Sequence, residues 1–301
     1  MNRMATSVGG VALPSAVLTA AGTAGFADEL AAYGDLAALG AVVTKSVAAF
    51  EWLGNRPPRV ASHGTAMLNS VGLAGPGVEA WRRDDLPALL RRGARVVASI
   101  WGRTVEEFRR AAEGLAGAEI AAVEVNTSCP NVEDRQSMFA HSARATAAAV
   151  EAAAAAGVPR WVKLSPNTPD LLSIARAARD AGADALVVIN TVFGMAIDVE
   201  RRRPVLGNVG GGVSGPGLLP VALRAVYDCR DALPDVPIVG VGGIWSGKDA
   251  VAMLMAGADA VEVGSATFAD PRAPWRIARE LERWLERHGE SVRSITGVAH
   301  E

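Results

Sequence analysis

Residues 161–190, WVKLSPNTPDLLSIARAARDAGADALVVIN, contain two short apolar runs on either side of an amphipathic segment. Trp161–Leu164 is expected to be a strand, Pro169–Ala181 has helical spacing, and Leu186–Asn190 is expected to be the next strand. Runs that are apolar almost throughout are typical of parallel strands buried on both faces. This stretch therefore predicts one βαβ unit.

The same alternation extends in both directions along the chain. Further strands are expected at Val17–Ala20, Ala41–Lys45, Val96–Ile100, Ala121–Asn126, Ile238–Val241 and Ala260–Val263. Further helices are expected near Ala27–Leu39, Gly77–Arg91, Thr104–Ala116, Ser142–Ala156, Leu218–Leu233, Ser246–Ala256 and Pro274–Arg287. Eight strands, each followed by a helix and with no shift in composition, predict a single (β/α)₈ TIM barrel domain over residues 1–301. A doubly wound open sheet is the alternative.

Two features lie outside this regular pattern. The connections Ser46–Thr65 and Thr191–Gly217 are long, and long loops in a compact domain are usually functional. Residues 1–21 have the outline of a secretory signal, but Gly9-Gly10 and Pro14 interrupt the apolar stretch. The period-2 pattern around these residues predicts a short β-hairpin instead.

Composition excludes several classes of function. The 30 basic and 32 acidic residues leave a formal charge of −2, which does not indicate a nucleic-acid or membrane-surface partner. No charge-free apolar run reaches the roughly 18 residues of a membrane-spanning helix. Two cysteines are too few for a disulfide framework and fit a reducing compartment, so a cytoplasmic protein is expected.

Lysine is rare in this chain and stands where chemistry is expected. Only Lys45, Lys163 and Lys248 are lysine among the 30 basic residues. Lys45 ends the second predicted strand and Lys163 lies in the fifth, and a TIM barrel carries its active site at the carboxyl ends of its strands. A site that places one compact cation against a flavin or a carboxylate selects lysine over the planar arginine. Solvated lysines at strand ends are the alternative.

Asparagines gather on the same predicted face. Four of the eight are at loops or strand ends there: Asn69, Asn126, Asn131 and Asn190. Each offers an acceptor and two donors without charge. Asparagine is also common in turns, but four at one rim favour a neutral planar ligand with amide N–H and C=O groups, such as a pyrimidine.

One cysteine falls in the predicted mouth of the barrel. Cys129 lies in Asn126-Thr-Ser-Cys-Pro-Asn131, directly after the fourth strand. A thiol beside Lys45 or Lys163 would ionise readily, which predicts a base or nucleophile. Cys229 falls inside a predicted helix and is expected to be an inert packed thiol. No His/Cys pair has ligand spacing, so no metal site is expected.

Glycines follow the last two predicted strands. The segments are Val241-Gly242-Gly243-Ile244 and Val263-Gly264-Ser265-Ala266. Glycine lets backbone N–H groups approach a phosphate closely, and TIM barrels often bind one after strands seven and eight. Two glycine segments at matching positions predict a phosphorylated ligand, with tight turns as the alternative.

Taken in order, the motifs resemble class 1 dihydroorotate dehydrogenase over nearly the whole chain. They are Val43–Ser46, Gly54–Arg59, Met67–Leu73, Asn126–Val132, Val162–Asn167, Ile189–Thr191, Gly211–Pro216, Gly242–Ile244 and Val263–Ser265. Cysteine at position 129 is typical of class 1, because the membrane-associated class 2 enzymes have serine there. Asn190–Asp198 is most similar to the B-type catalytic subunit.

The resemblance implies that the phosphorylated ligand is FMN. Its phosphate would lie on Gly242, Gly243, Gly264 and Ser265, and Lys163 would face the pyrimidine end of the isoalloxazine, where a cation stabilises the anionic reduced flavin. The further implied FMN contacts are Ala21, Lys45, Ser46, Ser99, Asn126, Ile189 and Gly215.

The resemblance also implies where the substrate binds. Dihydroorotate would be held by Asn69, Asn126, Asn131 and Asn190, with Thr191 and the segment Ser70, Val71, Gly72 and Leu73 alongside. Lys45 would lie near the carboxylate. Cys129 would remove a proton from the ring while a hydride passes to flavin N5.

Three positions depart from the family pattern. Ala21 replaces the usual serine at the first flavin contact, Ser99 replaces the usual asparagine at the end of the third strand, and Ala74-Gly75 replaces a common Gln-Asn. These changes affect FMN binding or the second half-reaction in this interpretation. They leave Cys129 and the four asparagines in place.

The expected function is FMN-dependent oxidation of (S)-dihydroorotate to orotate in de novo pyrimidine (UMP) biosynthesis. A related flavin barrel that oxidises another dihydropyrimidine, and a non-catalytic FMN- or orotate-binding protein, are the alternatives. The B-type resemblance implies an electron-transfer subunit with FAD and an iron–sulfur cluster that passes electrons to NAD, and a homodimeric core. Two cysteines cannot supply a four-thiolate cluster. Fumarate or a quinone remains open as the acceptor.

Overall fold

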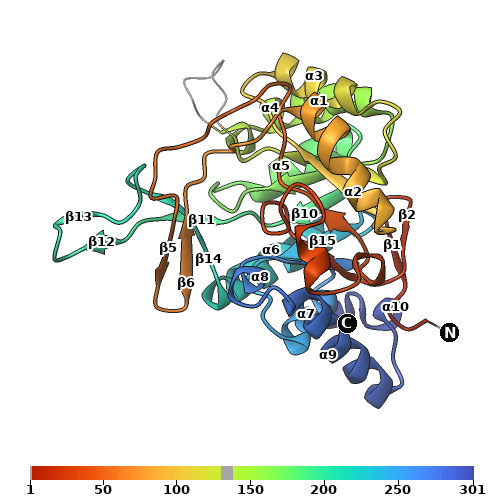
Figure 1. Cartoon of the computed structure of the whole chain (residues 1–301). Coiled ribbons are helices and arrows are strands. Elements are labelled where there is room, and N and C mark those ends of the chain that lie inside the picture. Colours follow the sequence, from red (N-terminus) through yellow and green to blue (C-terminus); the bar gives the residue numbers. More distant parts are fainter. Residues whose placement is uncertain (1, 130–137) are drawn as a thin grey trace.

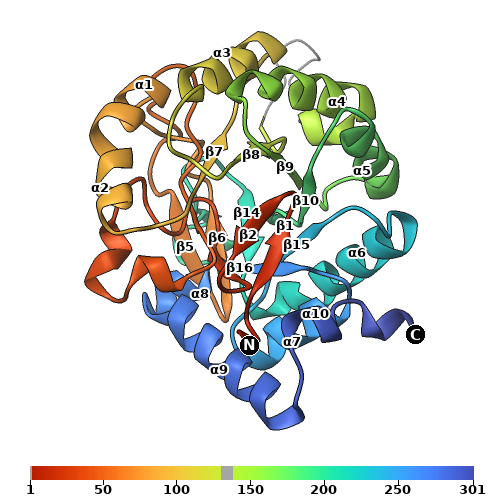
Figure 2. The same cartoon turned by 90° about the vertical axis from the view of Figure 1, so that its right-hand side faces the viewer.

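A ring of eight parallel strands forms the centre of the molecule (Figures 1 and 2). The computed structural model describes residues 2–129 and 138–301. Around the ring the strands are β3 (Val17–Thr19), β16 (Ala260–Val263), β15 (Ile238–Val241), β10 (Ala185–Val188), β9 (Arg160–Leu164), β8 (Ala122–Asn126), β7 (Val96–Ile100) and β4 (Val42–Val43). Between β4 and β3, Gly40 N donates to Val17 O at 2.9 Å and Thr19 N to Ala41 O at 3.3 Å. The predicted TIM barrel is confirmed, and the open sheet is excluded.

Helices surround the ring, as Figure 2 shows. Six of them begin within two residues of the predicted positions: α3 (Val105–Leu115), α4 (Ala143–Ala152), α5 (Leu171–Asp180), α6 (Leu219–Ala232), α7 (Gly247–Met255) and α9 (Ala273–His288). Side-chain caps explain four of these starts, since Thr104, Ser142, Asp170 and Ser246 each accept a hydrogen bond from the third helical amide. Shorter segments are α8 (Ala266–Ala269), α10 (Val292–Ile295), η4 (Phe139–His141), η5 (Ala153–Ala156), η6 (Pro216–Leu218) and η7 (Val298–His300).

Two predicted helices are interrupted in the structure. The segment expected near Ala27–Leu39 consists of two 3₁₀ turns, η1 (Glu29–Ala32) and η2 (Leu36–Ala38). A Cβ at Gly34 would lie 2.5 Å from Trp275 Cε2, and Asp35 caps the second turn by accepting from Ala37 N. The close packing at Gly34 follows the end of the first turn, and the cap at Asp35 begins the second. The prediction of a continuous helix is therefore wrong here.

Proline explains the second interruption. The segment expected at Gly77–Arg91 contains α1 (Val78–Ala80), a π-helical turn η3 (Trp81–Asp85) and α2 (Leu86–Arg91). Pro87 lies in the first turn of α2 and has no amide hydrogen to continue the preceding ladder. Among the described helices, none is long and apolar enough to cross a membrane.

The two long connections form β-structure at the carboxyl end of the barrel. β11 (Val192–Gly194), β14 (Gly211–Ser214), β6 (Ala66–Asn69) and β5 (Val60–His63) make one antiparallel sheet in that order. β12 (Ile197–Asp198) and β13 (Arg203–Pro204) pair as an arm that projects from the molecule in Figure 1. Local sequence patterns predict loops for these segments, because β6 and β14 pair across 143 positions and such distant partners leave no local signal.

The predicted N-terminal hairpin is confirmed and closes the opposite end of the barrel. It consists of β1 (Thr6–Val8) and β2 (Val11–Leu13). Val8, Val11 and Leu13 pack with inward-facing strand residues such as Trp161 and Val187. Because the hairpin covers the amino ends of the strands, solvent access to the barrel interior is from the carboxyl ends.

Candidate functional site

A pocket of about 810 Å³ opens at the carboxyl ends of the barrel strands, under the four-stranded sheet. Its volume is within the range of small-molecule and cofactor sites. Most predicted site residues line it: Ala21, Lys45, Ser46, Asn69, Ser70, Val71, Gly72, Leu73, Asn126, Lys163, Ile189, Asn190, Thr191, Gly242, Gly243, Gly264 and Ser265. Ser99, Cys129 and Gly215 do not line it, and Asn131 lies outside the described residues.

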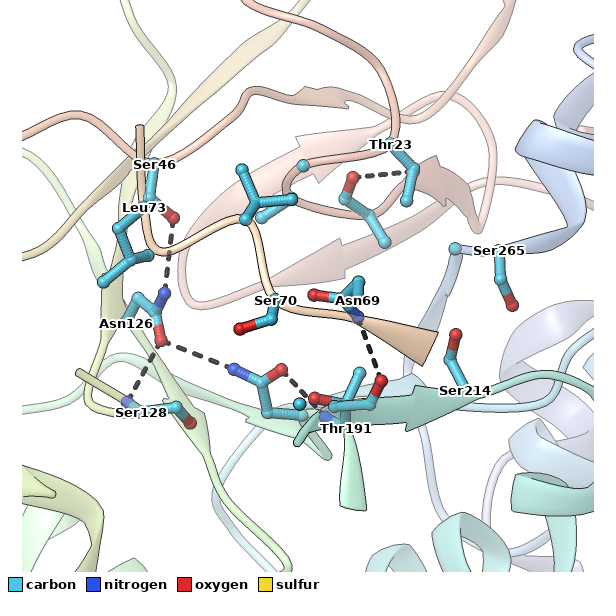
Figure 3. A pocket seen from close by; sticks show the side chains of 18 of the residues that line it. Thr23, Ser46, Asn69, Ser70, Leu73, Asn126, Ser128, Thr191, Ser214 and Ser265 are labelled. Atoms are coloured by element: carbon cyan, nitrogen blue, oxygen red, sulfur yellow. Dashed lines mark hydrogen bonds between the residues drawn. The ribbon is translucent and has the colours of Figure 1, made fainter. Parts of the chain in front are cut away.

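Hydrogen bonds orient three of the predicted asparagines in this pocket (Figure 3). Asn126 donates to Ser46 Oγ at 3.3 Å, and its Oδ1 accepts from Ser128 N at 3.1 Å. Asn190 donates to Asn126 Oδ1 at 3.4 Å and accepts from Thr191 N at 2.8 Å. Asn69 donates to Gly212 O at 3.4 Å, across the join between β6 and β14. Each side-chain amide keeps a second N–H for a ligand.

Beneath these amides the barrel interior carries charge. Lys163 lies two residues after Trp161 on β9, and Trp161 faces the barrel interior. Because side chains alternate along a strand, Lys163 also points inward, closer to the carboxyl end of the barrel. Its Nζ is 2.8 Å from Glu262 Oε2 and 3.3 Å from Glu124 Oε2, and both glutamates are fully buried. Burial alone would lower the pKa of Lys163, but the two carboxylates outweigh it and raise the pKa. Lys163 is therefore a permanent cation in the pocket floor.

A chain of hydroxyls joins this charge to the asparagines. Ser99 Oγ donates to Glu124 Oε1 at 2.9 Å and lies 2.8 Å from Ser46 Oγ. Because the proton of Ser99 goes to Glu124, Ser46 must donate to Ser99 and accept from Asn126. Ser99 is fully buried, so it lies beneath the pocket and acts through Ser46.

Lys45 differs from Lys163 in having no counter-ion. No carboxylate of the described residues lies within ion-pair distance of it, and burial lowers its pKa to about 8. Its stem passes Gly22, where a Cβ would lie 3.3 Å from Lys45 Cδ. Gly22 has a φ of +86° and leaves room for the lysine to reach the pocket. An ammonium in this position is suited to an anionic ligand.

Cys129 does not have the surroundings that the sequence analysis expected. Its thiol is fully buried and donates to Gly102 O at 2.9 Å, with Asn126 O at 3.3 Å. Burial, with a smaller contribution from the charge of Glu107, raises the pKa of Cys129 to about 12. The expectation that a nearby lysine makes this thiol ionise readily is therefore wrong for this geometry. The expectation for Cys229 is confirmed, since it is buried in α6.

The two glycine segments meet at one end of the pocket. Gly242 and Gly243 have φ angles of +130° and +74°, which disfavour other residues. A Cβ on Gly243 would lie 2.3 Å from Leu219 N, so the backbones are in close approach there. Gly264 and Ser265 face the same space, before α8. The three glycines leave backbone amides accessible at this end of the pocket, and Ser265 adds a hydroxyl.

Several residues of the site were missed. Trp52, Trp101, Arg103 and His141 also line the pocket. The Arg103 guanidinium is 4.6 Å from the Phe50 ring centre and 2.7 Å from Glu107. Trp101 and Arg103 directly follow β7, so the strand-end rule that selected Lys45 would also have selected them.

Glu124 and Glu262 were missed as well, although the sequence carried a signal. Each is the one carboxylate in a mostly apolar predicted strand, Ala121–Asn126 for Glu124 and Ala260–Val263 for Glu262. A charged residue in such a strand is almost never buried without a partner. Lys163 is that partner.

Comparison with known proteins decides the family. A family model described as dihydroorotate dehydrogenase matches residues 3–285. The chain belongs to the dihydroorotate dehydrogenase family. It is accordingly an oxidoreductase, and the resemblance stated from its motifs is confirmed.

Relatives of this dihydroorotate dehydrogenase family member match over almost their full length. The "Dihydroorotate dehydrogenase B (NAD(+)), catalytic subunit" of Desulforudis audaxviator is 46% identical over 301 residues, covering 99% of this chain and 98% of that protein. Proteins of the same name from Geobacter sp. strain M21 and Geobacter sulfurreducens are 44% and 42% identical, covering 98% and 95% of this chain and 97% and 94% of their own lengths. The B-type resemblance agrees with these names.

Proposed function

We propose that this chain, as a single barrel domain, oxidises (S)-dihydroorotate to orotate in de novo pyrimidine biosynthesis with FMN as its cofactor. One observation carries the proposal: the glycine cradle, the buried Lys163 and the ring of asparagines open into one pocket. A phosphate would bind in the glycine cradle, a flavin ring would bind against Lys163, and a neutral cyclic diamide would bind to the asparagines. The family and the names of its relatives agree with this reaction.

The volume of the pocket and its lining residues support FMN as the ligand. Gly242, Gly243, Gly264 and Ser265 would hold the phosphate, and Lys163 would lie against the pyrimidine edge of the ring. Ala21 and Ile189 line the same pocket and supply apolar surface for the ring. When bound, FMN supplies the acceptor for a hydride. Gly215 and Ser99 would act through the neighbours Ser214 and Ser46, because neither lines the pocket.

Dihydroorotate would lie on the open side of the pocket. Asn69, Asn126 and Asn190 would bind its ring amides, together with Thr191 and the backbone of Ser70–Leu73, and Lys45 would bind its carboxylate. Asn131 is assigned to the same set from its place in the motif.

Cys129 would act as the base that removes the ring proton. For this step the thiol must leave Gly102 O and turn toward the pocket, and it must lose its own proton to do so. Because burial holds its pKa near 12, we propose that the thiol turns toward the pocket when substrate binds and that the small ionised fraction of Cys129 removes the ring proton.

Anaerobic addition of dihydroorotate to the purified protein tests the function. We expect bound flavin to lose its visible absorbance within the mixing time of a manual experiment. A flavin that stays oxidised with dihydroorotate but is reduced by dihydrouracil would instead assign another dihydropyrimidine. A flavin reduced by neither would favour a binding role, and protein without flavin would contradict the proposal.

The pKa of Lys45 predicts how orotate affinity depends on pH. The bound carboxylate favours charged Lys45, so affinity should be constant below pH 8 and weaken as the amine loses its proton above it. We expect the Kd of orotate to rise up to about tenfold per pH unit between pH 8 and 9. Lys45→Met should bind weakly with no such dependence, whereas Lys248→Met, at an exposed position, should behave like the wild type. A pH-independent wild-type Kd would contradict this role.

We further propose a partner subunit that removes the electrons. The relatives are named catalytic subunits of NAD-dependent enzymes, and such a name implies a second subunit in those proteins. For this chain the partner would carry FAD and an iron–sulfur cluster and would reduce NAD in the cytoplasm. Both cysteines are free thiols, as in reducing compartments. If fumarate or a quinone reoxidised the reduced flavin of the isolated chain as fast as dihydroorotate reduces it, that compound would instead be assigned as the acceptor.

We also propose a homodimer that uses the projecting arm. The side chains of Ile197 and Val199 are 57% and 74% exposed. Three more apolar side chains of the same connection, Phe193, Met195 and Val209, are at least half exposed. Exposed apolar residues in a cluster mark association surfaces. Sedimentation should therefore give a dimer for the wild type and a monomer for Ile197→Lys/Val199→Lys. A dimer in both would place the interface elsewhere.

A further inference from the structure

Glu262 is a buried acid that the proposed reaction does not use. It lies on β16 in the barrel interior with no solvent exposure. Its Oε2 accepts from Lys163 Nζ at 2.8 Å, but its Oε1 has no hydrogen-bond partner among the described residues. A buried ionised carboxylate normally has both oxygens satisfied. The open oxygen is therefore a place where a proton can reside.

Glu262 shares Lys163, its cation among the described residues, with a second carboxylate. Glu124 binds the same Lys163 at 3.3 Å and also accepts from Ser99, so its two oxygens are both in use. With all three groups ionised, the cluster has a net charge of −1 in the buried interior of the barrel. With one carboxyl protonated, its net charge is zero. Burial and the charge of Glu124 raise the pKa of Glu262 to about 8, against the attraction of Lys163.

Within residues 2–129 and 138–301, no further charge in the surroundings of Glu262 changes this balance. There, Lys163 on β9 and Glu124 on β8 are the charged groups that act on it. Its neighbours in the sheet register are Val241 on β15 and Leu18 on β3, which are both apolar. The net charge of the cluster therefore depends on the protonation of Glu262 and on the charge of the ligand that binds next to Lys163 in the pocket.

We propose that Glu262 takes up one proton from solvent when two electrons enter the flavin against Lys163, so that the floor of the pocket does not accumulate negative charge. This inference rests on the proposed placement of FMN. The electrons come from dihydroorotate as a hydride, and the ring proton of the substrate goes to Cys129. The proton that converts the Glu262 carboxylate to a carboxylic acid comes from water and is returned on reoxidation.

The effect is confined to alkaline pH. Below pH 8 Glu262 is already protonated in the oxidised protein, and no further proton is taken up there. Above pH 8 it is ionised until reduction makes its charge unfavourable. Glu262→Gln keeps the neutral form at every pH, and glutamine has nearly the same shape.

Spectroelectrochemical titration of the bound flavin between pH 6 and 10 tests the proposal. Wild type and Glu262→Gln should have the same pH slope of the midpoint potential below pH 7.5. Above pH 8 the midpoint potential of the wild type should fall by about 30 mV per pH unit more than that of Glu262→Gln, because the wild type takes up one additional proton per two electrons. The exposed Glu282→Gln is the control and should follow the wild type. Equal slopes for wild type and Glu262→Gln above pH 8 would overturn the proposal.

A second measurement needs no variant. An electrode supplies electrons alone, so proton uptake by the wild-type protein can be counted with a pH indicator in weak buffer at pH 9. We expect two protons per flavin, one for the flavin and one for Glu262, and one proton would overturn the inference. Protein that binds no flavin, or flavin that dihydroorotate does not reduce, would contradict the proposed function. Reducible flavin with an unchanged slope would contradict only the role of Glu262.

Discussion

Replacing Cys129 by alanine should slow reduction of the flavin by dihydroorotate by about 10²–10⁴-fold, the usual contribution of a positioned base. The flavin should remain bound, because Cys129 does not line the pocket. Stopped-flow absorbance under anaerobic conditions measures the rate, and the ratio of flavin to protein measures binding. A variant that reduces its flavin at nearly the wild-type rate would exclude Cys129 as the base.

The second cysteine offers a matched control for this prediction. Cys229 is also fully buried, and burial also raises its pKa to about 12, but it lies in α6 on the outside of the barrel. Cys229→Ala should therefore reduce its flavin at the wild-type rate. Equal slowing in both variants would indicate a general loss of structure.

The pKa of Cys129 also gives the sign of the pH dependence. Because the thiolate is the base and its pKa is about 12, the fraction of thiolate rises about tenfold per pH unit below that value. Flavin reduction at saturating dihydroorotate should accelerate as pH increases from 6 to 9. A rate that levels off near pH 7 would show that the bound substrate lowers the thiol pKa by several units.

Lys163→Met should have the second large effect, on both stability and flavin binding. The change leaves Glu124 and Glu262 buried without their cation. Breaking a buried ion pair in this way costs about 3–5 kcal/mol of unfolding free energy. Urea denaturation of the apoprotein measures that loss, and fluorescence titration with FMN should show weaker binding. A variant with wild-type stability and FMN affinity would contradict the role given to the cluster.

The loss in Lys163→Met should depend on pH. Without the cation the pKa of Glu262, which burial already raises to about 8 against an unfolded value of about 4.5, should rise further. Below pH 8 Glu262 is protonated in both proteins, so the stability deficit should be constant there and grow above pH 8, where the wild type loses the proton and the variant keeps it. Lys163→Met/Glu262→Gln should recover part of the loss at pH values where Glu262 is ionised in Lys163→Met, while Lys248→Met should not change stability.

The local pattern of the sequence was sufficient for the barrel and for much of the site. Short runs that are apolar almost throughout placed all eight strands, and helical spacing placed six helix starts within two residues, where caps such as Thr104 and Ser246 lie in the structure. The strand-end rule then brought Lys45, Asn126 and Asn190 to one mouth, because parallel strands end on the same side of a barrel. These features depend on residues a few positions apart, so a single sequence contains them.

Other features depended on contacts between distant segments, and the sequence alone did not determine them. The sheet of β5, β6, β11 and β14 joins two connections that no local rule pairs. The surroundings of Cys129 depend on Gly102, and those of Lys163 depend on carboxylates from β8 and β16. A charge or a thiol has no fixed pKa until burial and neighbours are known. The sequence therefore determined which groups reach the pocket, and the tertiary structure decided how each of them ionises there.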